Sequence, residues 1–293
     1  MLERGGFDSL PESVWKRSAV LNTWGSNAVE GSTITREEAE RLLLDGMSVE
    51  GRPVRDVVET LQHEKAFRGL LDRRNREITL VTVLELYEDV FRGILPDAGQ
   101  WRRVNVRIRG ASFTPPRMEK VLREMEAWER SYRQRDLAGE ETFSLAVWMH
   151  YEFERIHPLS DGNGRVGRLL LNLHFLRRNW PPVHVLPRHR EEYLSSLNAA
   201  YRGDFSGMIE LLMVLTASSL LDLLDQVGTA EDELIPLRVA SEGSPYGDHY
   251  LALRCKQAEL PALKTGREWR TSRRALRLYR MFGGRKRGRS RSS

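Results

Sequence analysis

The feature that most constrains this chain is a polar loop, residues 156–168, placed between two strongly apolar segments. Residues 143–153 are apolar on every side of a helix, and residues 169–176 contain five leucines and a phenylalanine. Helices that are apolar all round are buried in a core. The loop between them holds a histidine, an aspartate, an asparagine, glycines and two arginines. Because buried polar groups are costly unless a partner binds them, this arrangement indicates a functional site in a mainly helical protein.

The loop has the chemistry of a phosphate-binding cradle. Gly162 and Gly164 let the backbone adopt left-handed conformations and approach a ligand closely. Their N–H groups face the start of the following helix, where unpaired donors and the positive end of the helix dipole attract anions. Arg165 and Arg168 are three residues apart on that helix, so both guanidinium groups point to the same side and can hold successive phosphates. No Gly-Lys-Ser/Thr sequence follows, which excludes a Walker-type loop.

Two further side chains add the groups that a reaction needs. Asp161 supplies a hard oxygen ligand for one Mg²⁺ that bridges phosphates, with water in its other positions. His157 lies just outside the cradle, and a histidine titrates near neutrality, as a general base should. The alternative is a structural anion-binding loop. Such a loop needs neither a base nor a metal-binding carboxylate, so the sequence favours catalysis.

This loop resembles the signature of the Fic (filamentation induced by cAMP) family, H-x-F-x-[D/E]-G-N-G-R-x-x-R. One position differs, because Leu159 stands where the family has Phe, and Leu can fill the same anchoring role in the core. The resemblance implies transfer of AMP from ATP to a Ser, Thr or Tyr hydroxyl of a target protein. It also implies a role for each loop residue: His157 as the base, Asp161 as the Mg²⁺ ligand, Asn163 with the loop N–H groups of Gly162 and Gly164 on the α-phosphate, Arg165 on the β-phosphate and Arg168 on the γ-phosphate.

Other functions stay open at this point. Some Fic proteins use other nucleotides or transfer another phosphate-containing group, and some remove AMP with the help of an inhibitory glutamate. An alternative from a different class is a DNA-binding regulator that acts through residues 244–281 and carries a weak catalytic core.

A second motif precedes the core. Ser26-Asn27-Ala28-Val29-Glu30-Gly31 closes a helix that the sequence predicts over residues 13–30; Ser26 and Glu30 share a face, and Gly31 ends it. From the residues alone this is a surface helix terminus with a capping serine. The motif also matches the Fic inhibitory pattern [S/T]-x-x-x-E-[G/N], and its position resembles the class whose inhibitory helix is N-terminal. The resemblance implies that Glu30 pairs with Arg168, takes the place of the γ-phosphate and blocks productive ATP binding.

The rest of the chain predicts a helical scaffold that is interrupted once. A capping box at Thr35–Glu38 starts a short helix. Apolar residues at helical spacing predict further helices over residues 56–71, 81–94, 118–128, 193–201 and 205–224. Residues 104–109 alternate strictly, and a turn at Gly110-Ala111 with a return to Thr114 predicts a short β-hairpin. This hairpin resembles the flap that aligns the target in Fic proteins; a surface decoration is the alternative.

Length and charge predict the division into domains. At 293 residues the chain exceeds one typical domain. Residues 254–293 hold fourteen Lys or Arg against two Glu, a balance of +12, which leaves −7 for residues 1–253 of a chain whose net charge is +5. We expect N-terminal helices with the inhibitory helix over residues 1–100, a Fic core with its flap over 101–225, a linker over 226–244, a winged-helix-like module over 245–281 and a disordered basic tail over 282–293.

The basic module bears on partners. Residues 250–279 resemble the winged-helix part of excisionase-type helix-turn-helix proteins, which makes DNA an expected partner; a basic face for protein contacts is the alternative. The remaining expected partners are ATP and a protein substrate, and a homodimer is compatible with the sequence.

Cysteine use and hydropathy bear on location. The single Cys255 excludes an intramolecular disulfide and fits a reducing compartment. No charged-then-apolar leader opens the chain. The longest apolar run, Met208–Leu224, contains Glu210 and Asp222, so a core helix is favoured over a membrane span. We expect a cytoplasmic protein without a membrane partner.

Overall fold

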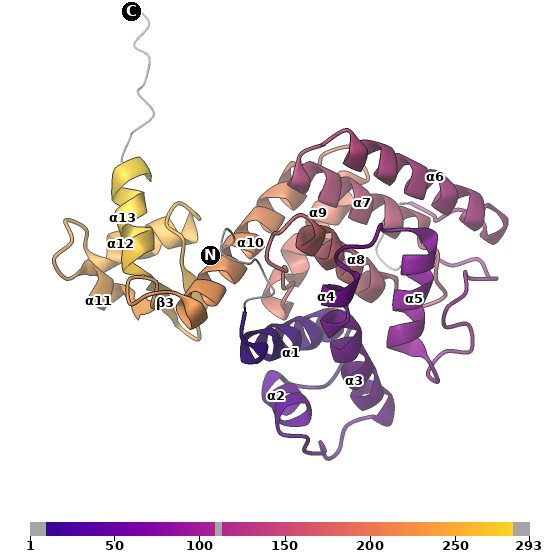
Figure 1. Cartoon of the computed structure of the whole chain (residues 1–293), viewed down its shortest axis with the longest axis horizontal. Coiled ribbons are helices and arrows are strands. Elements are labelled where there is room, and N and C mark those ends of the chain that lie inside the picture. Colours follow the sequence, from indigo (N-terminus) through magenta and orange to yellow (C-terminus); the bar gives the residue numbers. More distant parts are fainter. Residues whose placement is uncertain (1–9, 109–112, 284–293) are drawn as a thin grey trace, which may run out of the picture. The chain divides into compact units, whose positions relative to one another are not determined.

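The computed structural model describes residues 10–108 and 113–283 of the chain (Figure 1). Contacts divide the chain into two compact units, Met1–Met213 and Val214–Ser293. A long helix, α10 (Ser206–Val227), runs through the point of division. The other helices of the N-terminal unit are α1 (Glu12–Val29), α2 (Arg36–Leu44), α3 (Val54–Arg68), α4 (Leu70–Arg73), α5 (Leu80–Phe91), α6 (Met118–Leu137), α7 (Thr142–Ile156), α8 (Asn163–Arg177), the 3-10 turn η3 (Pro187–His189) and α9 (Arg190–Ala200).

The centre of the N-terminal unit is the helix α8, with α7 packed against it. Every residue of α8 from Arg165 to Leu176 is buried. Helices α1, α4 and α5 also contact α8, and α6 covers α7. This surrounding explains why residues 169–176 are apolar on all sides, because α8 has no face turned to solvent. Most of α7 is buried as well, and its partly exposed residues include Ser144, Trp148 and Arg155. The polar loop between them is therefore held at the middle of the unit.

The predicted helices are present, and their ends are set by local chemistry. The helix expected over residues 13–30 is α1, after which Gly31 takes a φ of +98°. The capping box is formed: Thr35 Oγ1 accepts from the Glu38 N–H at 3.2 Å, and Glu38 Oε2 accepts from the Thr35 N–H at 2.8 Å. The single helix expected over residues 56–71 is instead two, α3 and α4, which meet at Gly69.

The β-hairpin predicted over residues 104–114 is not present as strands in its described parts. Residues 104–108 and 113–114 form an irregular loop, and the predicted turn falls within residues 109–112, which lie outside the described residues. An isolated two-stranded hairpin is marginally stable in water. The segment is fastened instead by the buried Arg102, whose guanidinium donates to the carbonyl oxygens of Val104 and Pro116 at 2.8 and 2.5 Å.

The C-terminal unit is a small mixed fold. Its elements after α10 are β1 (Ile235–Pro236), α11 (Leu237–Ser241), α12 (Asp248–Lys256), β2 (Leu263–Thr265), β3 (Glu268–Thr271), α13 (Arg273–Leu278) and the π turn η4 (Tyr279–Gly283). The three strands form an antiparallel sheet in the order β1-β3-β2, with Ile235 opposite Thr271 and Lys264 opposite Trp269. After Gly247 the unit runs as a helix, a strand, a turn at Gly266, a second strand and a helix capped by Ser272. The resemblance to a winged helix stays a prediction.

Residues 226–244 do not form the linker that the sequence predicts. They contain β1, which pairs with β3, and α11, whose Leu237 and Ala240 are buried in the core of the unit. The Gly, Pro and polar residues of this segment are typical of a linker. In the structure, however, Ile235–Pro236 form the edge strand β1 of the sheet. The tail beyond residue 283 lies outside the described residues.

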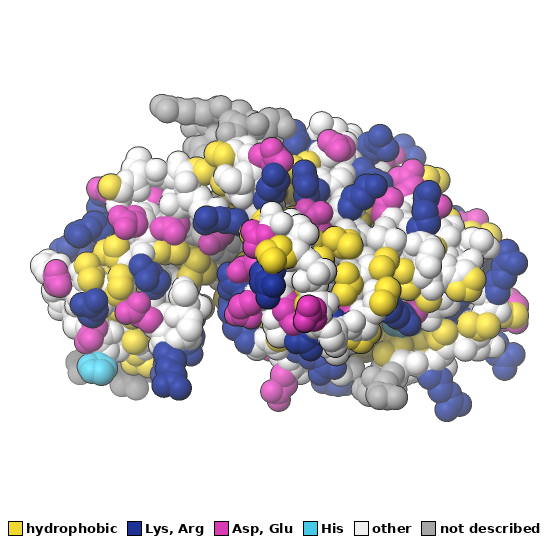
Figure 2. Space-filling model, turned by 90° about the horizontal axis from the view of Figure 1, so that it is seen from below, with side chains coloured by type: hydrophobic (Ala, Val, Ile, Leu, Met, Phe, Trp, Pro, Cys, Tyr) yellow, Lys and Arg dark blue, Asp and Glu magenta, His cyan; other side chains and the backbone are white. Residues whose placement is uncertain are grey.

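In the described part of the C-terminal module, ion pairs within the unit engage Arg254, Arg270, Arg274 and Arg277. Arg274 Nε donates a hydrogen bond to Asp232 Oδ1 at 2.6 Å, and this hydrogen bond lowers the pKa of Asp232 to about 2. Arg277 pairs with Glu231 at 2.7 Å. On the face of the molecule that Figure 2 presents, Lys and Arg side chains are interspersed with Asp and Glu. Arg274 and Arg277 would therefore have to leave these partners before contacting a phosphate backbone.

The helix α10 is long and apolar enough to cross a membrane by length and composition, a test that core helices of soluble proteins also pass. The first part of α10 carries Met208, Leu211 and Leu212, which are all buried. Their burial favours the predicted core helix.

Candidate active site

The polar loop is shaped by left-handed backbone at both of its ends. His157 closes α7 with φ 50° and ψ 60°, and Gly162 precedes α8 with φ 75°. A Cβ on residue 162 would collide with the ring of Phe91, so this position needs glycine for its conformation and for the space. A left-handed conformation is uncommon for a residue with a side chain, and at His157 it is maintained by a hydrogen bond from Arg102 Nε to the His157 carbonyl oxygen at 2.8 Å.

The middle of the loop is pinned by the side chain of Asn163. Its Oδ1 accepts from the Leu159 N–H at 2.9 Å, and its Nδ2 donates to the Leu159 carbonyl oxygen at 2.9 Å. Leu159 itself is fully buried, so leucine anchors the loop in the core as expected. Both ends of the Asn163 amide are thus engaged by the loop backbone, and its predicted contact with the α-phosphate stays a prediction. The first turn of α8 has no side-chain cap, which leaves its N–H groups for a ligand.

His157 has the arrangement of a base that is neutral at physiological pH. Nδ1 lies 3.3 Å from the carbonyl oxygen of Glu154, which can only accept, so Nδ1 carries the proton and Nε2 has the lone pair. Burial lowers the pKa of His157 to about 4; the Glu154 carbonyl opposes this change and the charge of Arg102 adds to it. The side chain is still 21% exposed, so an incoming hydroxyl can reach it.

Arg168 is enclosed by the predicted inhibitory motif. Its guanidinium is 3% exposed and donates to Ser26 Oγ at 2.9 Å, to the Ser26 carbonyl oxygen at 3.0 Å and to Glu30 Oε1 at 2.7 Å. Burial acts to raise the pKa of Glu30, but the charge and hydrogen bond of Arg168 outweigh it and the pKa is lowered. A Cβ on Gly164 would collide with Glu30 Oε1. The Glu30 carboxylate therefore lies directly over the first turn of α8, where a phosphate would bind.

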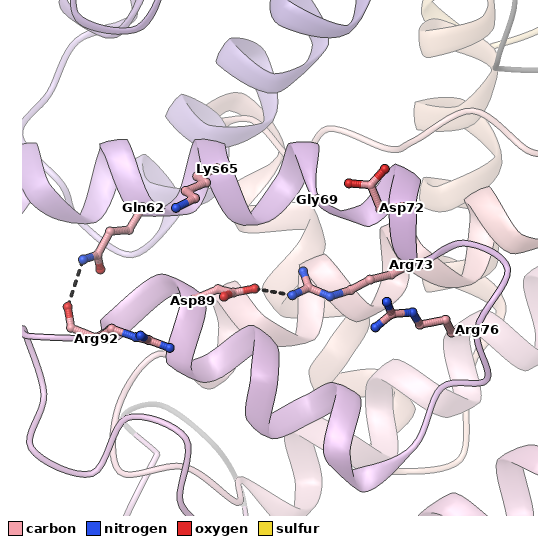
Figure 3. A pocket seen from close by; sticks show the side chains of 8 residues that line it. All are labelled: Gln62, Lys65, Gly69, Asp72, Arg73, Arg76, Asp89 and Arg92. Atoms are coloured by element: carbon pink, nitrogen blue, oxygen red, sulfur yellow. Dashed lines mark hydrogen bonds and ion pairs between the residues drawn. The ribbon is translucent and has the colours of Figure 1, made fainter.

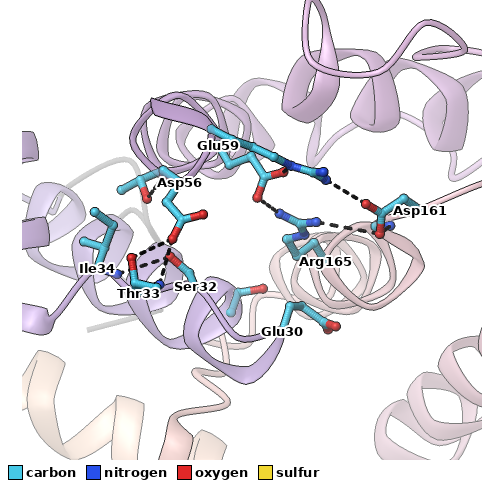
Figure 4. A network of polar contacts seen from close by, with 12 residues as sticks. Glu30, Ser32, Thr33, Ile34, Asp56, Glu59, Asp161 and Arg165 are labelled. Atoms are coloured by element: carbon cyan, nitrogen blue, oxygen red, sulfur yellow. Dashed lines mark hydrogen bonds and ion pairs between the residues drawn. The ribbon is translucent and has the colours of Figure 1, made fainter. Parts of the chain in front are cut away.

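Helix α3 contributes a second set of charges to the cradle, and Figure 4 shows Glu59, Asp161 and Arg165 joined in one network. Arg165 NH1 donates to Glu59 Oε2, and the Arg165 guanidinium lies over the Phe91 ring with 4.5 Å to its centroid. Arg55 donates to Glu59 Oε1 at 2.7 Å and to Asp161 Oδ2 at 2.8 Å. Arg165 and Glu59 are both buried, so this pair fixes the direction of the guanidinium. The sequence did not predict the contributions of Arg55 and Glu59, because their i, i+4 spacing on α3 indicates only that the two side chains can pair with each other.

Asp161 fits a single Mg²⁺ that is shared with phosphates. Its side chain is 49% exposed; Oδ1 accepts from the Gly162 N–H at 2.7 Å, while Oδ2 holds the Arg55 guanidinium. Mg²⁺ binds through one or two carboxylates and keeps phosphate and water oxygens as its other ligands. Among residues 10–108 and 113–283 no group of three or more His, Cys, Asp or Glu is placed to hold a metal. A metal at Asp161 would thus depend on the nucleotide for its remaining ligands.

The cradle contrasts with a nearby pocket that carries no such chemistry. Figure 3 shows this pocket of about 490 Å³, lined by Gln62, Lys65, Gly69, Asp72, Arg73, Arg76, Asp89 and Arg92. It lies among α3, α4 and α5, and none of its lining residues belongs to the polar loop. In the cradle, by contrast, Glu30, Arg55 and Glu59 are hydrogen-bonded to Arg168, Asp161 and Arg165.

The structure brings together all the residues that the sequence singled out. His157, Asp161, Gly162, Asn163, Gly164, Arg165 and Arg168 share one loop and helix start, and Ser26 and Glu30 reach it from α1. His63 is buried and bonded to Thr23 at 3.2 Å, as a structural histidine should be. Tyr193 is also a core residue, bonded to His150 at 2.6 Å. Arg102 and Glu154 were not predicted, and nothing in the sequence around Arg102 distinguishes it from an exposed arginine.

Comparison with known proteins agrees with this geometry. Residues 77–175 match the family model described as Fic/DOC family. The protein adenylyltransferase fic-1 of Caenorhabditis briggsae is 29% identical over 220 residues, which cover 73% of this chain and 43% of that protein. The chain thus spans less than half the length of this relative.

Solved structures share the fold. Fic-1 of Caenorhabditis elegans superposes with a TM-score of 0.65 at 26% identity, covering 75% of this chain and 68% of that one. A Fic family protein from Desulfovibrio desulfuricans has a TM-score of 0.63 at 20% identity and covers 93% of this chain and 90% of its own. The predicted Fic-type helical fold is confirmed.

Proposed function

Residues 77–175 match the Fic/DOC family model, and on that premise we propose that the chain is a protein adenylyltransferase. It moves AMP from ATP to a Ser, Thr or Tyr hydroxyl of a target protein. The observation that carries this proposal is the placement of a neutral histidine, His157, beside an uncapped helix start that bears two buried arginines. A relative that covers 73% of this chain is named a protein adenylyltransferase, which supports the same reaction.

Each step falls to a residue whose geometry suits it. His157 Nε2 takes the proton of the target hydroxyl while the hydroxyl oxygen attacks the α-phosphorus in line, and pyrophosphate leaves. The N–H groups at the start of α8 stabilise the negative charge that gathers on the α-phosphate oxygens. Arg165, fixed by Glu59, holds the β-phosphate, and Arg168 holds the γ-phosphate. Asp161 would hold a Mg²⁺ that neutralises phosphate charge when it is bound.

In this proposal the enzyme is autoinhibited by the N-terminal helix α1. Glu30 binds the guanidinium that the γ-phosphate needs, and its carboxylate lies over Gly164. ATP can bind productively only after Glu30 leaves Arg168. Ser26 is uncharged, but its hydroxyl and carbonyl oxygens accept hydrogen bonds from Arg168. In this proposal these hydrogen bonds keep the guanidinium oriented when Glu30 is displaced.

The test is mass spectrometry of the full chain carrying Glu30→Gly, after incubation with ATP and Mg²⁺. We expect a mass gain of one AMP on the protein, greater than in the wild type, and no gain when His157→Ala is added. His157→Ala should still bind nucleotide, because the base does not contact the phosphates. No AMP adduct on the Glu30→Gly chain or on added proteins would refute the proposal. An adduct that forms only from a different nucleotide would identify another Fic reaction.

The proposed reaction uses residues of the N-terminal unit and gives no role to the C-terminal unit. DNA contact by this unit is the less favoured role, because Arg274 and Arg277 are paired with Asp232 and Glu231. A DNA mobility shift that is lost on deleting residues 245–293 would contradict this preference.

A further inference from the structure

A buried carboxyl group lies directly behind His157 and has no role in the mechanism above. Glu154 is one turn earlier on α7, so that His150, Glu154 and His157 fall on one face of the helix. Glu154 is 5% exposed, and its Oε2 lies 3.7 Å from His157 Nδ1. Its Oε1 has no hydrogen-bond partner within the described parts of the chain. An unpaired buried carboxyl is costly, and such a group calls for a functional explanation.

The surrounding helices make room for this group rather than exclude it. A Cβ on Gly167 of α8 would approach Glu154 Oε1 to 2.6 Å, so the carboxyl fits only because residue 167 is glycine. The same glycine brings its carbonyl oxygen to His150 Nδ1 at 3.2 Å. The position of Glu154 is thus built by two helices and is not the result of a loose side chain.

The charges that face Glu154 come from each element packed around it. Arg168 of α8 attracts its negative form and Glu30 after α1 repels it. Its neutral neighbours are Tyr193 of α9, Tyr201 after α9 and His150 of α7. Burial raises the pKa of Glu154 to about 8, with Glu30 adding to this rise and Arg168 opposing it. At neutral pH the group is therefore largely uncharged and can gain a charge when its surroundings change.

Building on the proposed adenylyl transfer, we propose that Glu154 is a positioning residue that orients the base His157 and sets its strength. Nδ1 of the imidazole lies close to both the backbone carbonyl oxygen and the carboxyl group of Glu154. This position of the ring directs Nε2 to the target hydroxyl. While Glu154 is neutral, His157 is a weak base. When Glu154 loses its proton, the negative charge next to Nδ1–H stabilises the imidazolium and makes Nε2 a stronger base.

The charge held at Arg168 affects the pH at which Glu154 ionises. A negative charge there, from the Glu30 carboxylate or from a bound γ-phosphate, keeps the Glu154 carboxyl protonated and His157 a weak base. In the Glu30→Gly chain without nucleotide that repulsion is lost, and Glu154 ionises at a lower pH. The rate of proton abstraction rises with the strength of the base, so ionisation of Glu154 should raise transfer by about three- to tenfold.

The experiment measures His157 directly and the rate separately. Ring carbon signals of His157, assigned by their loss in His157→Ala, are followed by NMR from pH 5 to 9.5 in the wild-type chain, in Glu154→Gln and in Glu152→Gln. Glu152 is the matched control, because it lies on the same turn of α7 and pairs with Arg155 instead. The same two substitutions, and Glu154→Ala, are placed in the Glu30→Gly chain, and AMP transfer is measured over the same pH range.

We expect the His157 signals of the wild type to shift near pH 8, and this shift to be absent in Glu154→Gln and kept in Glu152→Gln. In the Glu30→Gly chain the alkaline rise in transfer should be present, and Glu154→Gln should flatten it. His157 signals that do not respond to Glu154→Gln would overturn the inference. So would an equal loss of transfer at every pH in Glu154→Gln and Glu154→Ala, since a structural role alone predicts that. If the NMR shift is found and no chain transfers AMP, the proposed function fails while the link between Glu154 and His157 stands.

Discussion

Replacing Glu30 by glutamine should make the cradle bind nucleotide more tightly. Glutamine keeps the size of the side chain and removes the charge that competes with a γ-phosphate for Arg168. The pair is 2.7 Å long, with Arg168 3% exposed and Glu30 38% exposed. A charge-assisted hydrogen bond contributes about 1.5–3 kcal/mol when buried, and solvent at Glu30 reduces this to about 1–2 kcal/mol. Releasing that competition corresponds to a Kd lower by about 5- to 30-fold.

The assay is calorimetric titration of a non-hydrolysable ATP analogue with Mg²⁺ into the wild type and Glu30→Gln. Glu40→Gln is the control, because Glu40 makes an exposed ion pair with Arg36 at 2.9 Å on α2 and should leave the Kd unchanged. The pKa of Glu30 lies below its ordinary value, since the charge and hydrogen bond of Arg168 outweigh burial, so the carboxylate stays ionised from pH 6 to 8. Titration of Glu30 itself should therefore add no pH dependence to the difference in Kd over that range. A folded Glu30→Gln chain whose Kd stays within twofold of the wild type would refute the reasoning.

Two further substitutions test the groups that the sequence did not reveal. Arg102→Met removes the hydrogen bonds from a buried guanidinium to the carbonyl oxygens of His157, Val104 and Pro116, so the free energy of unfolding should fall by about 2–4 kcal/mol. The rate of AMP transfer should also fall by a larger factor than the affinity for nucleotide. The control is Arg103→Met, and equal stability of the two variants in urea would contradict this role for Arg102. Glu154→Gln should remove a pH dependence of stability: the pKa of Glu154 is raised from its ordinary value of 4.5 to about 8 in the folded state, so the wild type loses stability as the pH rises from about 4.5 to about 8, by a few kcal/mol in all and mostly by pH 7. The glutamine chain should show no such loss. Melting temperatures of the two chains should agree near pH 4.5 and separate by about pH 7, and parallel curves would show that this carboxyl is not perturbed.

The sequence alone determined the helices and the local chemistry of the loop. Apolar residues on all sides of 143–153 and 169–176 required two buried helices, and the glycines at 162 and 164 required a backbone that closely approaches its neighbours. These features are readable because they depend on spacing along one chain. The pairing of Glu30 with Arg168 was also expected, because residues 26–31 resemble the Fic inhibitory motif and residues 157–168 resemble the Fic signature.

Only the tertiary structure decided which distant groups share the site. Arg55 and Glu59 meet Asp161 and Arg165 because α3 packs against α1 and α5, which both contact α8, and a helical i, i+4 pair does not reveal its partner across the core. Residues 226–244 resemble a linker by composition, yet pairing of β1 with β3 makes them part of a sheet. The raised pKa of Glu154 has the same origin, because burial between helices far apart in sequence, and not the residue type, sets the free energy of a charge.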